Sequence, residues 1–352
     1  MTHILCFNID DVLGLPSEPG ADYRFVSLRD ASFTAAAFLR LGFRNEMNAW
    51  MGWLAARCAE SQASDGKMQQ LYGLRGETNL APIVLPDVPG YKNSGPVTIG
   101  HAQADRSTID HYGAILITAY LSNKYSDPMS YECWTVTRKF VNYVCEHWSE
   151  PVAGLWPDDA NREPNHYIAA KLLCWVCVDR GIHLAQDRSF PAPLDQWRRV
   201  RNEIYCDIQT KGYNTALRRY TAAYDNTNLD VAMLLMPITS FVAPTDPKFL
   251  STLDAILKSV TDGQIRKRQK SAEANRSRAS SCKFTILTCL LCDSLVCCCC
   301  SRRPDESLDA APLQRSRSRQ RRICVPAVDD HHWFVLGDRG VHARRPGGQE
   351  AS

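Results

Sequence analysis

Residues 166–185, HYIAAKLLCWVCVDRGIHLA, constrain the fold more than any other stretch, because they are apolar on nearly every side of a helix. A helix without a polar face must be surrounded by other elements. The next helical segment, residues 194–211, is amphipathic and carries charges along one side, as expected of a helix at the surface. The two segments together predict two layers of helices, with 166–185 inside and 194–211 outside.

Helical periodicity continues through most of the chain from Ala31 to about Lys258. Further helices are predicted at 31–43, 45–61, 108–125, 131–148, 228–241 and 246–259. Asn45 is the expected cap of the second of these helices, and Pro237 is expected to end the helix at 228–241. Residues 62–100 are rich in Gly, Pro and Asn, with short apolar runs that predict small strands. The fold class is therefore all-α, with about eight helices before residue 260.

Composition narrows the class of protein. A chain of 352 residues that is 45% apolar and 22% charged can bury one large core or two modest ones. The net charge of +3 is too small to indicate nucleic acid binding.

The first 20 residues lack the basic region and apolar core of a secretory signal, so the expected location is the cytoplasm. Among the 15 cysteines, neither the scattered group nor the crowded group shows paired CxxC spacing joined to a second pair or to histidines, and neither a metal nor a cofactor is predicted.

The character of the chain changes after about residue 261. A basic, Ser-rich stretch is followed by an apolar, Cys-rich run at 282–300 and by another polar stretch. The apolar run barely reaches the length of a membrane span and contains Asp293, which disfavours a transmembrane helix. An acylated cysteine patch is a second interpretation. The favoured interpretation is a disordered tail or a non-native translated segment.

The tail also contains a cluster of acidic residues and histidines, Asp329, Asp330, His331 and His332. Adjacent residues rarely point at one ion from a regular element, so chance explains this cluster better than a metal site does. The chain is thus predicted to consist of an N-terminal segment at 1–13, a helical domain at 14–260 and a tail at 261–352.

An ordered series of motifs runs from about residue 14 to residue 258. The motifs are DYRFVSLRDASFTAAAFLRLGF, MGWLAARC, LYGLRGETNL, GYKNSGPVTIGHA, DHYGAILITAY, GLW, AAKLLCWVCVDRGIHLA, WRRVRNEIYCDIQTKGYN and NLDVAMLLMPITSF. Their order and spacing resemble glycoside hydrolase family 15, the glucoamylases and glucoamylase-like trehalases, and the cytoplasmic fungal members most closely. The resemblance implies an (α/α)6 toroid with its pocket at the mouth of the inner ring. About eight helices are counted where twelve are needed, so a partial, truncated toroid is expected.

The resemblance also implies a chemistry. The family hydrolyses α-glucosidic bonds with inversion, using one carboxylic acid and one carboxylate base about 6.5 to 9.5 Å apart. By resemblance, Arg29 and Asp30 hold hydroxyls of the terminal glucose, a task suited to a guanidinium beside a carboxylate. Trp156 matches a tryptophan that lines the pocket. Asp30 is also expected to cap the helix that follows, a role compatible with sugar binding. Without the resemblance, Trp156 would be interpreted as a core residue.

The catalytic acid and base both depart from the family pattern. The family places a glutamate directly after the tryptophan, whereas this chain has Pro157. Alignment leftward from REPNHY indicates a two-residue insertion that brings Asp159 into the register of the acid. Asp158 and Asp159 are therefore the acid candidates, and two solvated loop aspartates are an equally good interpretation. The glutamate-glycine-alanine-phenylalanine motif of the base has no match after residue 260.

The leading interpretation is a glucoamylase- or trehalase-like hydrolase of carbohydrate metabolism that is catalytically impaired, with an α-glucoside or glucose-containing oligosaccharide as its ligand. The alternative is a non-catalytic carbohydrate-binding or interaction protein on a partial toroid. A mis-spliced or frame-shifted form of a working hydrolase would also explain the change near residue 261. An open ring would expose an apolar inner face, which favours self-association.

Overall fold

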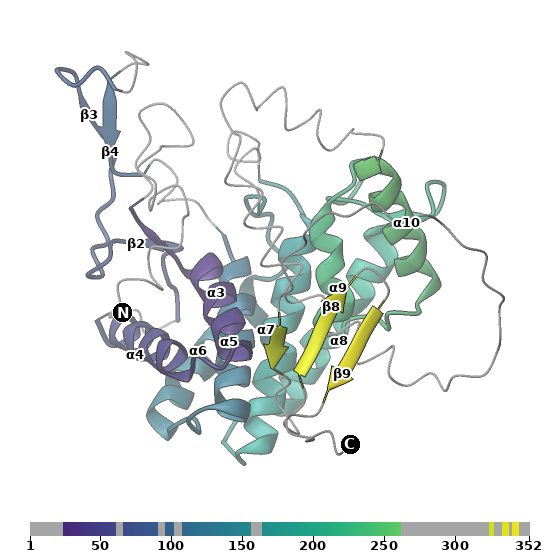
Figure 1. Ribbon diagram of the computed structural model, residues 1–352, viewed down its shortest axis with the longest axis horizontal. Helices are drawn as coiled ribbons and strands as arrows, with labels where there is room; N and C mark the ends of the chain where they lie inside the picture. The colour runs from purple at the N-terminus through teal and green to yellow at the C-terminus, as the bar shows by residue number, and fades with distance from the viewer. Residues whose placement is uncertain are drawn as a thin grey trace, which may run out of the picture.

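The computed structural model describes residues 24–60, 66–90, 96–101, 108–155 and 164–261, together with the backbone of three strands between residues 324 and 344. The long helices are α3 (Leu28–Arg40), α4 (Arg44–Glu60), α5 (Asp110–Tyr125), α6 (Tyr131–His147), α7 (Ile168–Asp187), α8 (Leu194–Lys211) and α10 (Pro247–Thr261) (Figure 1). A 3-10 turn, η3 (Val231–Leu234), runs directly into the short helix α9 (Leu235–Ile238). The predicted all-α class is confirmed.

The two predicted layers are present. Helix α7 buries most of its residues on all sides, including polar ones such as Lys171 and Asp179. Helix α8 buries only the single stripe Trp197, Val200, Ile204 and Ile208. Helices α3, α5 and α7 pack against one another in a row, and each of α4, α6 and α8 packs against a member of that row. Helices 166–185 and 194–211 thus occupy the inner and outer layers as predicted.

The inner helices α5 and α7 approach each other closely at Gly113. A Cβ atom on Gly113 would lie 2.2 Å from the carbonyl oxygen of Leu173, a distance at which the helices would have to move apart. Gly113 lies in the first turn of α5 and Leu173 in the second turn of α7. The two helices therefore meet near their N-terminal ends.

The start of α3 is fixed by a short pairing with the irregular segment. Strand β1 (Val26–Ser27) pairs with β2 (Leu71–Tyr72) in antiparallel fashion, and Leu28 N–H donates to the carbonyl of Gln70. Ser27 is the N-cap of α3, and its hydroxyl accepts from the backbone N–H of Asp30 at 3.3 Å. Asp30 is thus in the first turn of the helix, and its interpretation as the cap is wrong, because α3 begins three residues earlier than the periodicity indicated.

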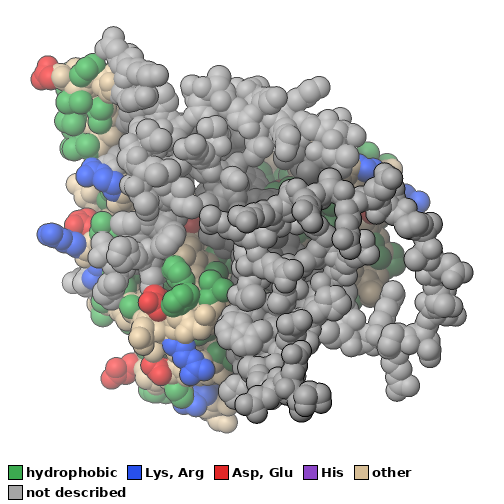
Figure 2. Space-filling view, viewed as in Figure 1, with side chains coloured by type: hydrophobic (Ala, Val, Ile, Leu, Met, Phe, Trp, Pro, Cys, Tyr) green, Lys and Arg blue, Asp and Glu red, His purple; other side chains and the backbone are tan. Residues whose placement is uncertain are grey.

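The other strands are short. Strand β3 (Ile83–Leu85) pairs with β4 (Val97–Ile99) in a hairpin that stands away from the helices, with the exposed side chains of Ile83 and Val84 on its surface (Figures 1 and 2). Strand β5 (Tyr213–Asn214) pairs with β6 (Arg219–Tyr220) after α8. The small strands predicted within 62–100 are confirmed.

A three-stranded antiparallel sheet lies in the tail, formed by β7 (Cys324–Pro326), β8 (Trp333–Gly337) and β9 (Gly340–Arg344). It was not predicted, although the aromatic and β-branched residues at 333–335 favour a strand. The domain boundary near residue 260 stays a prediction. Among the described residues, the helices are too short or too polar to cross a membrane, and the run at 282–300 lies outside that part of the chain.

Candidate functional site

A buried ion-pair cluster joins the first turns of α3 and α5. The Arg29 Nη1 donates to Asp110 Oδ2 at 2.8 Å, and its Nε donates to Asp30 Oδ1 at 3.2 Å. The Arg29 side chain is 10% exposed and that of Asp110 is 1% exposed, whereas Asp30 is 41% exposed. The Arg29 guanidinium is therefore paired with one buried carboxylate, Asp110, and with one partly exposed carboxylate, Asp30.

The charges of this cluster support one another. Burial alone would lower the pKa of the Arg29 guanidinium, but the charges and hydrogen bonds of Asp30 and Asp110 outweigh it and raise that pKa. Both carboxylates lie in the first turn of a helix, where the helix dipole favours negative charge. Arg29 stays a cation, and its position is fixed from two helices at once.

The sequence did not identify Asp110 or His111 as members of this site. His111 is 1% exposed, and its Nδ1 lies 3.5 Å from the hydroxyl of Thr108. Within the described part of the chain, His111 Nε2 and Asp110 Oδ1 are buried without a hydrogen-bond partner. Burial lowers the pKa of His111 to about 4; the Asp110 charge opposes this effect and the Arg29 charge adds to it. His111 is therefore neutral near pH 7.

This buried histidine predicts a pH dependence of stability. The folded-state pKa of about 4 lies below the ordinary value of 6.5, so the unfolded chain binds more protons between these values. The stabilisation is complete above pH 6.5 and is lost as the pH falls towards 4, by about 3 kcal/mol in total. In a His111→Gln variant, urea unfolding at pH 7, 5.5 and 4.5 should lack this part of the acid sensitivity. If the free energy of unfolding depended on pH equally in the variant and the parent chain, the assignment of this acid sensitivity to His111 would be contradicted.

The three other predicted site residues, Trp156, Asp158 and Asp159, lie outside the described residues, as does Pro157. The chain on one side of this segment pairs with the chain on the other side. Val152 and Asn165 form an antiparallel bridge with two hydrogen bonds. This bridge holds the two ends of the segment together.

Helix α7 is also hydrogen-bonded to the chain just before Val152. The buried Lys171 donates from Nζ to the carbonyls of Trp148 and Glu150, the latter at 2.9 Å. Burial lowers the pKa of Lys171. The Tyr167–Ala223 bridge fixes the chain just before α7 begins. The residues that flank the candidate acids in the sequence thus lie at the N-terminal end of α7, and the inner helices hold Arg29 at the same end.

The chain just before α7 is connected to helix α8 through Tyr224 and Asp207. The His166 ring stacks on Tyr224 with centroids 5.6 Å apart, and the Tyr224 hydroxyl donates to Asp207 Oδ2 at 2.7 Å. Lys211 pairs with Asp207 at 2.6 Å. Burial would raise the pKa of Asp207, but the hydrogen bonds from Lys211 and Tyr224 prevail and lower it. Asp207 is therefore a structural acceptor, and it stays ionised.

Comparison with known proteins identifies the family. The sequence model described as glycosyl hydrolases family 15 matches residues 14–278. The chain belongs to this family. The trehalase of Mycobacterium tuberculosis is 30% identical over 276 residues, which cover 78% of this chain and 40% of the relative. The trehalase of Thermoplasma volcanium is 27% identical over 268 residues, covering 76% of this chain and 42% of the relative. The chain therefore spans about two-fifths of the length of these relatives.

Solved structures agree on the fold of this family 15 member. A wild-type glycosidase matches with a TM-score of 0.53 at 16% identity, covering 70% of this chain and 64% of the other. A glycosidase variant in complex with glucose matches with a TM-score of 0.50 at 15% identity, covering 64% and 58%. The predicted family is confirmed, and the closer resemblance to fungal members stays a prediction. Among the described residues, no group of three or more His, Cys, Asp or Glu could hold a metal ion.

Proposed function

We propose that this family 15 chain binds the terminal glucose of an α-glucoside between Arg29 and Asp30, and that it is an inverting glucoamylase- or trehalase-like hydrolase whose own catalysis is impaired. The observation that supports the proposal most directly is the buried Arg29 charge, held by Asp110 at 2.8 Å with the half-exposed Asp30 beside it. Such a pair is fixed before a ligand arrives, so binding costs little side-chain ordering.

The chemistry of the pair suits a sugar. A carboxylate accepts hydrogen bonds from hydroxyls, and a guanidinium donates to hydroxyl oxygens. Because these bonds involve charged groups, they are stronger than neutral ones. The relatives are named trehalases, and one solved glycosidase holds glucose. Trehalose and glucose are therefore the first ligands to test.

An Asp30→Ala variant should bind glucose about 10- to 100-fold more weakly than the parent chain, because it loses a hydrogen bond to a charged group. Isothermal titration calorimetry with glucose and trehalose measures the change. The matched control is Asp195→Ala, which removes an exposed carboxylate from the first turn of α8. Unchanged glucose affinity in a folded Asp30→Ala variant would refute the site.

The second candidate is a non-catalytic carbohydrate-binding or interaction protein. It is favoured by Pro157 at the acid position and by the lack of a base motif after residue 260, while the Arg29 pair stays intact. Both candidates predict glucose binding. They differ in turnover, which the impaired hydrolase keeps at a low residual rate and the non-catalytic protein lacks, so a sensitive hydrolysis assay separates them. Self-association through an open inner face also stays a proposal, and analytical ultracentrifugation would test it.

A further inference from the structure

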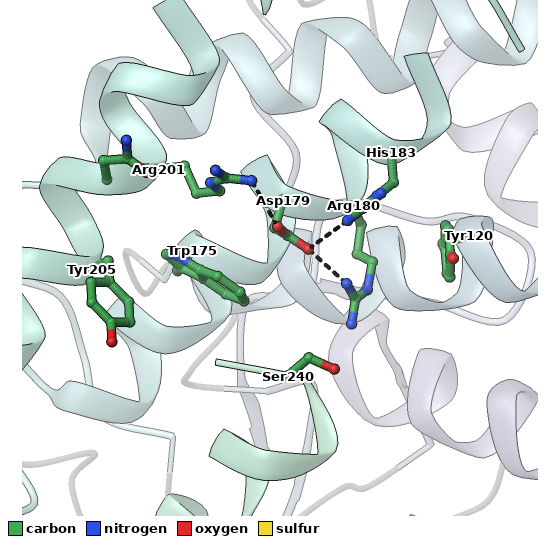
Figure 3. Close-up of a pocket in the computed structure, with 9 residues that line it drawn as sticks. Tyr120, Trp175, Asp179, Arg180, His183, Arg201, Tyr205 and Ser240 are labelled. Carbon is green, nitrogen blue, oxygen red and sulfur yellow. Dashed lines mark hydrogen bonds and ion pairs between the residues drawn. The ribbon is translucent and has the colours of Figure 1, made fainter. Parts of the chain in front are cut away.

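A cavity lies between the inner and outer helices, away from Arg29. Its volume is about 670 Å³, and it is lined by residues of α5, α7 and α8 and by the turn after α9 (Figure 3). Asp179 in its wall lies 11 residues after Ile168, the first residue of α7, or about 16 Å along the helix axis. The cavity therefore lies beyond the middle of the inner helices, separated from the Arg29–Asp110 pair at their N-terminal ends.

The cavity wall carries an excess of positive charge. Asp179 is 7% exposed; its Oδ2 accepts from Arg180 Nη1 at 2.6 Å and its Oδ1 from Arg201 Nη1 at 3.2 Å. The Nε2 of His183 lies 3.7 Å from Oδ2. Figure 3 shows these three basic side chains converging on the one carboxylate. Two guanidinium groups against one carboxylate leave a formal charge of +1, even with His183 neutral.

Both arginines project from helices, Arg180 from α7 and Arg201 from α8. Arg180 also donates from Nη2 to the carbonyl of Thr239 at 2.9 Å, and its guanidinium lies over the ring of Tyr120 at 5.3 Å. Arg201 is 29% exposed, and its ion pair with Asp179 uses one of its nitrogens. A guanidinium has five N–H donors in a planar fork. Arg201 can therefore hold Asp179 and still present donors to an anion in the cavity.

Aromatic side chains also line the cavity. The rings of Trp175 and Tyr205 each lie 5.0 Å from the ring of Phe241, measured between centroids. Tyr205 is 39% exposed, while Trp175 is buried. These amphipathic rings provide an apolar surface beside the charges. A ligand that joins an anionic group to a ring-shaped body can use both.

We propose that this cavity is a second ligand site that binds a small phosphorylated sugar. The planar guanidinium of Arg201 matches phosphate oxygens in a bidentate manner, and the Asp179 carboxylate is screened from the ligand by its two arginine partners. The sugar ring lies against Tyr205 and Trp175. The volume is in the range of small-molecule sites. The site is independent of the proposed glucosidase activity.

Isothermal titration calorimetry of the full chain tests the proposal, with glucose 6-phosphate as the probe and with glucose and inorganic phosphate for comparison. The Asp30→Ala chain is the background, because this substitution is expected to weaken binding at the first site. Glucose 6-phosphate should bind more tightly than either comparison compound, and its affinity should fall as salt is added. Arg201→Ala should weaken binding about 10- to 100-fold, the effect of losing a charged hydrogen bond.

Two further variants keep the result interpretable. Arg198→Ala removes an exposed arginine from the same helix, outside the cavity, and should leave the affinity unchanged. Arg201→Lys keeps the charge but lacks the fork, so it should bind less tightly than the parent and more tightly than Arg201→Ala. No binding by the folded background chain, or equal affinity with and without Arg201, would overturn the proposal. Equal affinity for inorganic phosphate would overturn the sugar contact, and equal affinity for glucose would overturn the anion contact.

Discussion

Purified chain incubated with trehalose or maltose is expected to release glucose barely faster than a control without protein. General acid–base assistance contributes about 10²- to 10⁴-fold for one group. By resemblance, the acid is expected directly after the tryptophan, where this chain has Pro157, which has no proton to give, and no stretch between residues 261 and 352 resembles the base motif. The two losses do not simply multiply, because the groups act as a unit, but either one alone should be severe. A coupled glucose assay at high protein concentration measures the rate.

Two variants separate the causes of this low rate. Pro157→Glu restores only the acid, so it should not restore hydrolysis while the base is missing. Asp159→Asn tests the inserted aspartate, and it should leave the background rate unchanged. Robust turnover by the parent chain that disappears in Asp159→Asn would contradict the proposal and show that the inserted residues supply the acid. The same result would exclude the non-catalytic alternative.

The layered helical fold could be predicted because it depends on local periodicity. Residues 166–185 have no polar face and residues 194–211 have one, and these patterns fix which helix is inside. Segment 228–241 was predicted as one helix, but it forms the turn η3 and the short helix α9. Pro237 cannot donate a backbone hydrogen bond, and Asp230 starts the turn by capping the N–H of Ala232. Helix α4 begins at Arg44, so Asn45 lies inside it and the predicted cap is wrong.

The site could be predicted only in part. Arg29 and Asp30 were found because they are adjacent in a motif, whereas Asp110 is 81 residues from Arg29 in the sequence. An aspartate before an apolar helix is usual at a helix start, so nothing local distinguishes Asp110 as a buried partner. The orphaned nitrogen of His111 likewise exists only once α5 is packed. Periodicity predicts which faces of a helix are buried, but it does not predict which polar groups pair when they are far apart in the sequence.

The buried Arg29–Asp110 pair predicts the largest effect on stability. An Arg29→Leu variant leaves the Asp110 carboxylate, 1% exposed, without its cationic partner. Removing one member of a buried pair costs about 3 to 5 kcal/mol, because an uncompensated charge stays buried. The free energy of unfolding, measured by urea titration with circular dichroism at pH 7, should fall by that amount. Asp110→Leu should cost less, since Asp30 still holds the Arg29 guanidinium at 3.2 Å.

The double variant Arg29→Leu/Asp110→Leu distinguishes a lost charge partner from lost packing. With both charges removed, no uncompensated ion remains, so the double variant should be more stable than Arg29→Leu alone. The control pair is Asp195 and Arg198, which lie 3.2 Å apart on α8 but are exposed; Arg198→Ala should leave the unfolding curve unchanged. A double variant as unstable as the sum of the two single variants would show that the pair acts through shape alone. Recovery in the double variant, together with loss of glucose binding, would instead show that the buried charge is retained for ligand binding.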